Sequence, residues 1–441
     1  MLPLAFLFVA SCASTSTAGL DDIDIDVMWE EEPALADADS HPEESRDKTG
    51  KRNSAKPVLQ TNFYHLTWQG QRIGEAKEVF HRSANGIRLI RSEEIRITRS
   101  GVPVDIETEI VIHADNKLRA TRVELSSRAG AVERKGRAIR ADDGSWVIAL
   151  EGESVRKAPA SAVPLELVPY LVARQGSRSF KSKVLLAGYG FAVTDMLIDR
   201  KGRKGKAILK TEWGDIETHL NMKGNGDLVS TETGATGSVR VDGNRFNEDF
   251  RRAELPESST IPVKGRGSEL LVSNVFRQPP PALVGQSIRL RKNGWQIQFD
   301  TRSQDVSRQI RKLAHEVDSL LSDSHDAPGA GGHDALSLGR GDCTAHATLF
   351  VDMATELGIE SKLVTGYRID DNKLVRHRWV VVKQGTKWVQ VDPTFGEAPV
   401  KPGHHLALAI HGDSTAQIAI VDEAVFLGLS KARARWVRDA I

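Results

Sequence analysis

The sequence predicts an α+β protein, in which a long antiparallel β region precedes a smaller region of mixed helices and strands. Between about residues 57 and 281, apolar and polar residues alternate with period two, and turn residues interrupt the alternation. From residue 282 to 441, runs with helical spacing of apolar residues are interspersed with strand-like runs. At 441 residues the chain is long enough for both regions to build a core.

The overall composition is that of an ordinary soluble protein. The formal net charge is +1, with 27% charged and 40% hydrophobic residues, so nothing in the balance of charge favours a nucleic-acid partner. The two cysteines, Cys12 and Cys343, stand in separate contexts, which makes a disulfide framework a poor interpretation.

The N-terminus is typical of an export signal. Residues 2–10 are apolar but too few to span a bilayer, and they lead into Val9-Ala10-Ser11-Cys12, which resembles a bacterial lipobox. We therefore expect residues 1–12 to be a signal that directs the chain to the periplasm or cell envelope, where lipid on Cys12 holds it at the membrane. No Lys or Arg precedes the apolar run, although a signal peptide normally has a basic start. An ordinary cleaved signal with a chance cysteine at position 12 is the alternative.

Residues 13–56 are predicted to be a disordered linker. The segment is acidic and otherwise rich in Ser, Thr and Ala, so it buries too little apolar surface to offset its chain entropy. An acidic docking tail is the alternative interpretation.

The β region, residues 57–281, is expected to form long hairpins in a curved sheet, a sandwich or an open barrel. A division into two halves is expected near residues 159–169. The basic run at residues 200–206 is interpreted as a solvated hairpin tip, with contact to an anionic polymer or lipid headgroup as the alternative. No aromatic residue interleaves with its charges, which disfavours a nucleic-acid platform. Pro279-Pro280-Pro281 marks the expected domain boundary. Because the region groups no catalytic side chains, we expect it to be a spacer, a substrate platform or a partner-binding module.

The second region begins with a helical pattern and ends in strands. Val306, Ile310, Leu313, Val317, Leu320 and Leu321 fall on one helix face, and residues 323–339 are expected to be a loop. A second helix follows, with Asp342 as its N-cap and Gly358 at its end. Its expected buried stripe is Leu349, Phe350, Met353, Ala354 and Leu357.

Cys343 lies in the first turn of that second helix. The helix N-terminus carries a partial positive charge, which favours a thiolate there. A structural cysteine is more often found in the middle of a helix, on the apolar stripe.

Three strand-like runs then carry a histidine and an aspartate. They are residues 361–369, 377–382 and 387–392. If Gln384 and Gly385 form a two-residue turn, His377 lies directly opposite Asp392, with Cβ atoms about 5 Å apart. The carboxylate then holds one imidazole nitrogen and leaves the other for a thiol.

These residues resemble the motifs of the transglutaminase-like superfamily. Gly341-Asp342-Cys343 with the following helix is similar to the first motif, His377-x-Trp379 to the second, and Asp392-Pro393-Thr394 to the third. The resemblance covers about residues 295–425. It implies a papain-like core in which the cysteine helix packs on an antiparallel sheet, within a catalytic domain at residues 282–441.

The resemblance also implies an activity. Cys343 would be the nucleophile, His377 the general base and acid, and Asp392 the residue that orients the histidine, with no cofactor. The expected substrate is a peptide or protein amide, and the expected intermediate is a thioester. Hydrolysis is favoured because the sequence shows no dedicated amine site. A protein-crosslinking transglutaminase, a non-catalytic peptide-binding scaffold and a cell-wall amidase are the alternatives.

Other residues receive simpler interpretations. His346 shares a helix face with Cys343 and is expected to pack or support rather than react. Trp379 and Trp388 are expected in the sheet core, and Trp379 is also a candidate for contact with substrate. The histidines at 333, 404, 405 and 411, with Asp334, match no zinc spacing, so no metal site is predicted. The backbone N–H of Cys343 is the candidate oxyanion donor.

Overall fold

The computed structural model describes residues 58–99, 102–211, 214–246, 249–255, 260–263, 267–275, 283, 285–300, 305–327, 332–370, 372–411, 418–429 and 431–439. The expected signal, the lipidation site Cys12 and the acidic linker lie outside the described residues.

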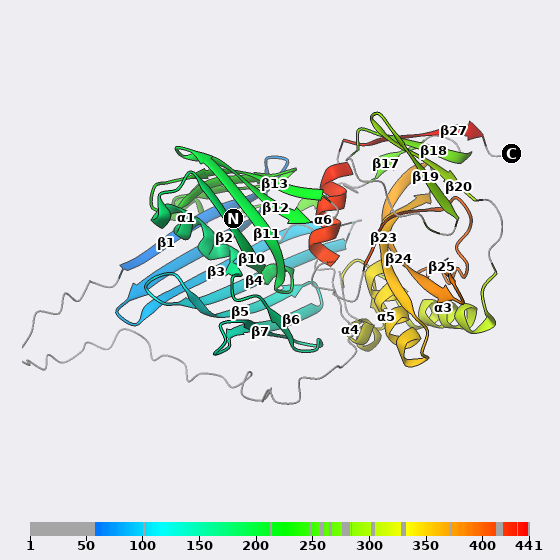
Figure 1. Cartoon of the computed structure of the whole chain (residues 1–441), viewed down its shortest axis with the longest axis horizontal. Coiled ribbons are helices and arrows are strands. Elements are labelled where there is room, and N and C mark those ends of the chain that lie inside the picture. The colour runs from blue at the N-terminus through cyan, green and yellow to red at the C-terminus, as the bar shows by residue number, and fades with distance from the viewer. Residues whose placement is uncertain are drawn as a thin grey trace, which may run out of the picture.

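The first half of the chain forms one 16-stranded, mainly antiparallel sheet that curves strongly (Figure 1). Its strands are β1 (Val58–Trp68), β2 (Gln71–Ser83), β3 (Gly86–Arg99), β4 (Val102–Ala114), β5 (Ala120–Ala129), β6 (Val132–Arg140), β7 (Trp146–Leu150), β8 (Arg156–Ala158), β9 (Val163–Pro164), β10 (Ser179–Leu186), β11 (Ala192–Lys201), β12 (Lys204–Thr211), β13 (Gly214–Met222), β14 (Leu228–Thr233), β15 (Thr236–Val241) and β16 (Ala253–Leu255).

The sheet consists of two meanders. Strands β1 to β8 are neighbours in chain order, β9 to β15 are likewise, and β1 pairs with β15 to join the two series. The chain passes from one series to the other between β8 and β9, at residues 159–162, and η2 (Leu165–Leu167) and α1 (Val168–Gln175) then connect β9 to β10. The division that the sequence predicts near residues 159–169 is therefore found. The remaining short helices of this half are η3 (Ala187–Tyr189) and α2 (Gly243–Phe246).

Alternation along the strands explains why this sheet has a core. In β1, Tyr64, Leu66 and Trp68 are buried at every second position and join the cluster inside the curve. The basic run lies where the sequence predicts it, at the β11–β12 hairpin, whose turn contains Gly202 with a φ of 64°.

The second half of the chain builds three further sheets. The five-stranded sheet has β24 (Lys373–Gln384) and β23 (Ser361–Asp370) at its centre, with β26 (His405–Ile410) beside β23, and with β17 (Ile261–Pro262) and β25 (Lys387–Val391) both paired to β24. The four-stranded sheet has the order β19 (Gln286–Arg291), β20 (Gly294–Phe299), β18 (Gly267–Ser273) and β27 (Arg433–Asp439). The two-stranded sheet pairs β21 (Ser322–Asp323) with β22 (Arg340–Gly341).

This pairing moves the expected domain boundary. The boundary after Pro281 would separate β18 from β20, although the two strands are hydrogen-bonded neighbours. The change from the large sheet to the later sheets occurs between β16, which pairs with β3, and β17, which pairs with β24. The second structural unit therefore begins near residue 260.

Four helices complete the second half. They are α3 (Arg308–Leu320), α4 (Gly332–Leu338), α5 (Cys343–Glu356) and α6 (Ile418–Leu429). Helix α3 buries Ile310, Leu313 and Val317 as the sequence predicts, but Leu320 is 40% exposed at its last turn. The predicted loop at residues 323–339 is also wrong in part, because α4 forms within it and packs on α5 through Ala335.

Helix α6 links the two halves. It packs on β13 of the large sheet as well as on β26, and in Figure 1 it lies between the two parts of the molecule. A hairpin tip makes a second link, because Val132 of β6 is buried in the cluster that contains α3 and α5. No helix in the described part of the chain combines the length and apolarity needed to cross a membrane.

Candidate active site

Cys343 is the first residue of α5. Asp342 caps the helix, its Oδ1 accepting from the backbone N–H groups of Thr344 at 2.9 Å and Ala345 at 3.4 Å. The helix ends before Gly358, whose φ of 69° suits the residue that follows a C-cap. Cys343 is a free thiol and partly exposed. Both helix ends agree with the sequence prediction, and the thiol is reachable from solvent.

The helix is held by its apolar side. Leu349, Phe350 and Ala354 are buried against Val380 and Val382 of β24, as expected. Leu357 is not part of this contact, contrary to prediction. It is the C-cap residue and 52% exposed, because α5 stops at Glu356 before its side chain can reach the sheet.

His377 and Asp392 meet, as predicted, but not as directly opposed residues. Gln384 pairs with Lys387, so the two-residue turn is Gly385-Thr386, and Gly385 takes a φ of 62°. The predicted register was therefore wrong by two residues. Because a shift of two preserves the face of a strand, His377 and Asp392 still converge. His377 Nε2 lies 2.8 Å from Asp392 Oδ2.

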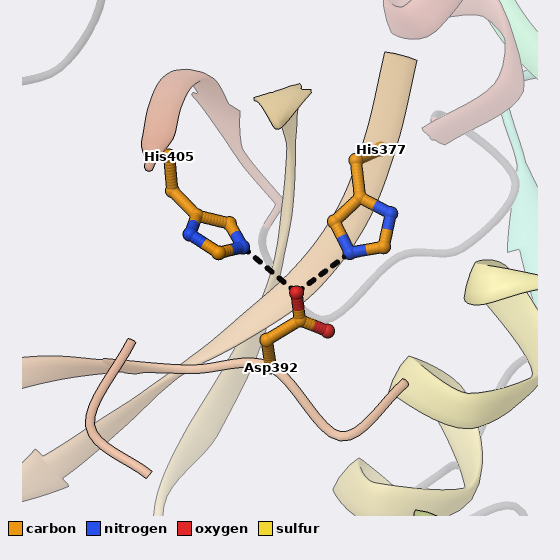
Figure 2. Close-up of side chains that lie close together, drawn as sticks. All are labelled: His377, Asp392 and His405. Atoms are coloured by element: carbon orange, nitrogen blue, oxygen red, sulfur yellow. Dashed lines mark hydrogen bonds and ion pairs between the residues drawn. The ribbon is translucent and has the colours of Figure 1, made fainter. Parts of the chain in front are cut away.

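A second histidine bonds the same oxygen of Asp392. His405, the first residue of β26, places its Nε2 at 2.7 Å from Oδ2, and Figure 2 shows the two imidazoles converging on that one atom. Thr394 donates its backbone N–H to Oδ1 at 3.1 Å. Asp392 is fully buried, and His405 is 2% exposed. The carboxylate is thus held from three directions.

Burial and charge set the protonation of the pair. Burial disfavours the charged form of His377, but the Asp392 carboxylate outweighs it through charge and hydrogen bonding, and Cys343 adds to this effect. The pKa of His377 is raised from 6.5 to about 10. For Asp392, burial is likewise opposed by His377 and by the hydrogen bond from His405, and its pKa is held well below the usual range. An imidazolium next to a carboxylate is therefore the stable state at neutral pH.

His405 has the opposite tendency. Its burial lowers its pKa despite the hydrogen bond to Asp392. It is therefore neutral at neutral pH and donates Nε2–H to the carboxylate. Its Nδ1 is buried and has no hydrogen-bonding partner in the described part of the chain.

The thiol of Cys343, at the start of α5, lies close enough to the His377 imidazole to help raise its pKa. Since Nε2 of His377 bonds Asp392, Nδ1 is the nitrogen left for the thiol. The arrangement can take the proton of a thiol onto the imidazole and stabilise the resulting ion pair by the buried carboxylate and by the helix N-terminus.

A buried ion pair fixes the start of α5 relative to the sheet. Arg378, next to His377, forms a salt bridge with Asp422 of α6 and donates to the Thr344 hydroxyl at 3.4 Å. The Thr365 hydroxyl donates to Asp422 at 2.6 Å. Burial raises the pKa of Asp422, but the charge of Arg378 outweighs it, so the pKa is lowered. The network therefore joins α5, β23, β24 and α6 beside the thiol.

Trp379 is placed to support the histidine rather than to meet a substrate. It is fully buried, donates Nε1–H to Gln390 at 2.8 Å, and lies nearly parallel to the His377 ring with centroids 6.0 Å apart. The expected contact of Trp379 with substrate is therefore not supported, since its ring is closed off from solvent. A side chain at Gly366 would place its Cβ 2.6 Å from this ring.

His346 is a buried helix residue, as expected. Its Nδ1 lies 3.0 Å from the Asp342 carbonyl oxygen and its Nε2 3.3 Å from that of Leu321, so both nitrogens have backbone partners. Among the candidate metal histidines, His411 lies instead at 2.8 Å from the Thr365 hydroxyl.

Within the described ranges, one group has the composition and spacing to hold a metal ion. It consists of His377, Asp392 and His405, whose ligand atoms lie within 4.8 Å of one another. However, the 2.7 and 2.8 Å separations are those of hydrogen bonds, while two ligands of a tetrahedral zinc would lie about 3.3 Å apart. The group therefore fits a hydrogen-bonded cluster better than a metal centre.

Sequence reasoning missed the role of His405. It stands at the start of the apolar run His405–Ile410, which is typical of a buried strand, and its only other signal was a neighbouring histidine. Its contact with Asp392 depends on the pairing of β26 with β23.

Comparisons with known proteins cover parts of the chain. Residues 296–393 match the family model of the transglutaminase-like superfamily. No curated protein matches the chain. The chain shows likeness to a solved β-barrel-like protein of the DUF1849 family from Brucella abortus, with 12% identity, a TM-score of 0.33, and coverage of 42% of this chain and 94% of that one.

Two further solved structures show weaker likeness. A duf1089 family protein from Pseudomonas aeruginosa has 8% identity and a TM-score of 0.25, with 43% of this chain and 95% of that chain covered. A "Putative Cysteine Protease" from Cytophaga hutchinsonii has 13% identity and a TM-score of 0.21, with 40% and 82% covered. All three TM-scores are below 0.5, which is too low to establish a shared fold.

The family match and the architecture agree with each other. The matched segment contains α3, α5 and strands β23 to β25, and it ends just after Asp392. The predicted fold class, an α+β molecule with an antiparallel β region before this core, is confirmed. The chain therefore carries a transglutaminase-like domain at residues 296–393, of a superfamily of cysteine enzymes.

Proposed function

We propose that this protein is a thiol enzyme that transfers acyl groups from peptide or protein amides through a thioester on Cys343, with water as the usual acceptor. The observation that supports this most is the 2.8 Å hydrogen bond between His377 and the buried Asp392 carboxylate, which stabilises the imidazolium form of His377 beside the Cys343 thiol. In this proposal, Cys343 is the nucleophile, His377 the general acid and base, and Asp392 the orienting group.

In the proposed reaction, His377 first donates its proton to the leaving group and then accepts a proton from water. The Cys343 thiolate attacks the amide carbonyl carbon, and the C=O electron pair moves to the oxygen. This oxyanion receives a hydrogen bond from the Cys343 backbone N–H, because Asp342 occupies the next two helix N–H groups. The C–N bond then breaks, and the departing nitrogen takes the proton from His377. Water loses a proton to His377 as it attacks the thioester, which releases the carboxylic acid and the thiol.

The test is incubation of the pure protein with a panel of peptides and a labelled primary amine. The proposal predicts peptide products that lack the label, formed by wild type and absent with Cys343→Ala. Incorporation of the amine without peptide cleavage would move the acceptor from water to an amine and make the protein a cross-linking enzyme. Binding of peptides without either product would support a non-catalytic scaffold.

We also propose that the protein acts at the cell envelope, held by lipid on Cys12. The support is the sequence at residues 9–12 alone. Cell fractionation tests it, because Cys12→Ala should release the protein from the membrane fraction. A variant that stays membrane-bound would contradict the proposal.

A further inference from the structure

Arg368 lies on the same face of the sheet as His377. The register pairs Gly366 with His377 and Arg368 with His405, and side chains two residues apart on a strand point to the same face. Arg368 therefore borders the cluster built around Asp392, although no step of the proposed reaction uses it.

The guanidinium of Arg368 is stacked on an exposed aromatic ring. Its Cζ lies 3.3 Å from the centre of the Phe395 ring, and that ring is 5.6 Å, centre to centre, from the imidazole of His377. Phe395 is 45% exposed and Arg368 is partly exposed. The pair thus lies at the surface immediately beside the reacting groups.

The hydrogen-bonding capacity of this guanidinium is not used. Its Nε and Nη1 are buried, and neither has an acceptor within the described ranges. Glu397 pairs with Lys401 at 3.2 Å through Oε1, and its buried Oε2 has no partner in the described part of the chain. The face of Phe395 attracts a cation but accepts no hydrogen bond in the plane of the guanidinium, so the covered N–H groups remain unsatisfied.

We propose that Arg368 and Phe395 form a subsite for a carboxylate group of the peptide substrate, which makes carboxylate-bearing peptides the preferred substrate class. This inference rests on the proposed acyl-transfer function. A planar guanidinium donates two parallel hydrogen bonds to a carboxylate, from Nη2 together with either Nε or Nη1, and the unsatisfied Nε and Nη1 leave both of these edges open. Rotation of the half-exposed Phe395 ring uncovers them, and the ring then packs on the apolar stem of the bound group.

The probes are alkylating reagents that carry the thiol-reactive group and a carboxylate in one molecule. N-iodoacetyl-glycine and its neutral amide compare a terminal carboxylate with its amide. N-iodoacetyl-glutamate α-amide and the corresponding glutamine compound make the same comparison for a side-chain carboxylate. The second-order rate of Cys343 modification is measured by mass spectrometry of the full chain, so no knowledge of the natural substrate is needed.

The variants isolate Arg368 from other charges. Arg368→Gln removes the guanidinium, and Arg368→Lys keeps the charge without the planar fork. Arg376→Gln is the matched control, since Arg376 is also stacked on a phenylalanine, Phe426 at 3.7 Å, but faces the other side of the sheet from His377. The imidazolium of His377 attracts anions equally in all variants, so it cancels from the comparison.

In wild type, we expect one anionic reagent to modify Cys343 about 10- to 100-fold faster than its neutral partner, the range of a charge-assisted hydrogen bond. Arg368→Gln should abolish this preference, Arg368→Lys should keep part of it, and Arg376→Gln should keep all of it. Which pair of reagents shows the preference tells whether the subsite takes a terminal or a side-chain carboxylate.

Two results would overturn the inference, and a third would contradict the proposed function on which the inference rests. Equal rates for charged and neutral reagents in wild type, or an unchanged preference in Arg368→Gln, would leave Arg368 as a structural cation stacked on Phe395. A Cys343 that reacts with none of the four reagents would instead contradict the activated thiol on which the proposed function depends.

Discussion

At the scale of single residues, the chemistry depends on one carboxylate that serves two histidines. Oδ2 of Asp392 lies 2.8 Å from His377 and 2.7 Å from His405, in a site from which water is largely excluded. Low dielectric strengthens such contacts and makes an unpaired charge costly. Each partner therefore influences the proton affinity of the others.

The stabilisation from this pair should depend on pH. The pKa of His377 is about 10, against 6.5 for an unperturbed imidazole, so folding favours its protonated form. The stabilisation that the pair contributes is fully present below the pKa of His377 in the unfolded chain, and it is lost as pH rises through the pKa of His377 in the folded protein. The difference in unfolding free energy between wild type and Asp392→Asn should therefore shrink between about pH 6.5 and about pH 10. Urea unfolding across this range measures it, and a difference that grows with pH would contradict the account.

His405 should restrain the basicity of His377. It donates one hydrogen bond to Asp392, and without this bond the carboxylate interacts more strongly with His377. In His405→Phe we expect the pKa of His377 to rise by roughly one unit, while His405→Gln, which keeps a side-chain N–H, should change it less. Titration of histidine ring signals by NMR gives this pKa directly. The neighbouring His404→Phe is the control, and an equal shift in both variants would refute a specific role.

At the scale of elements, the start of α5 determines where the thiol lies. Asp342 satisfies two of the N–H groups that a helix N-terminus leaves open, and it is only 1% exposed. Asp342→Ala should lower the free energy of unfolding by about 1 kcal/mol, whereas Asp342→Asn should cost less because an amide oxygen can still accept. Urea unfolding of the three proteins tests this, and equal losses in both variants would argue that the cap is unimportant.

The sequence predicts this element and its partners well because their determinants are local. Asp342, Cys343 and Gly358 act within one helix, and the His377 and Asp392 motifs lie on two strands joined by a tight turn. The turn lies one residue later than predicted, which shifts the strand register by two, since Gly385 suits the first place of a hairpin loop and Gln384 stays in the strand. The prediction that His377 and Asp392 share a face of the sheet was still correct, because side chains on a strand alternate with a period of two.

Local sequence patterns could not predict the features that depend on pairing between distant segments. His405 reaches Asp392 only because β26 pairs with β23. Helix α4 starts at Gly332 in a sequence with loop-like composition, and Ala335 packs it on α5. The run of prolines at 279–281 suggested a boundary, but β18 before it and β20 after it form one sheet. Local composition indicates where regular secondary structure is interrupted, but it does not indicate which strands pair with each other.

At the scale of the whole molecule, the large sheet supports the segment that precedes Cys343. Val132, at the tip between β5 and β6, is 2% exposed and packs in the cluster that contains Leu321, Ala327 and Ala335. The neighbouring Ala131 donates its backbone N–H to the carbonyl oxygen of Asp326 at 3.1 Å. The β half is therefore part of the framework of the site.

Shortening Val132 should weaken that framework. We expect Val132→Ala to lower the free energy of unfolding by about 2 kcal/mol, because it removes buried methyl groups and leaves a gap. It should also speed amide hydrogen exchange at residues 321–327. The control is Val239→Ala, at a position that is 48% exposed on β15, which should change stability by less than about 0.5 kcal/mol. Unchanged exchange in Val132→Ala would mean that the two halves are not coupled at this contact.

The central claim is that Cys343 forms a thioester with the acyl part of an amide substrate, assisted by His377. Mass spectrometry of the intact protein, acid-quenched soon after mixing with a peptide panel, tests it most directly. The account predicts an acyl adduct on Cys343 in wild type, its accumulation in Asp392→Asn if deacylation slows more than acylation, and its absence in Cys343→Ala. Cleavage of peptides by wild type without such an adduct would contradict the account. So would a His377→Ala variant that forms the same adduct at the same rate as wild type.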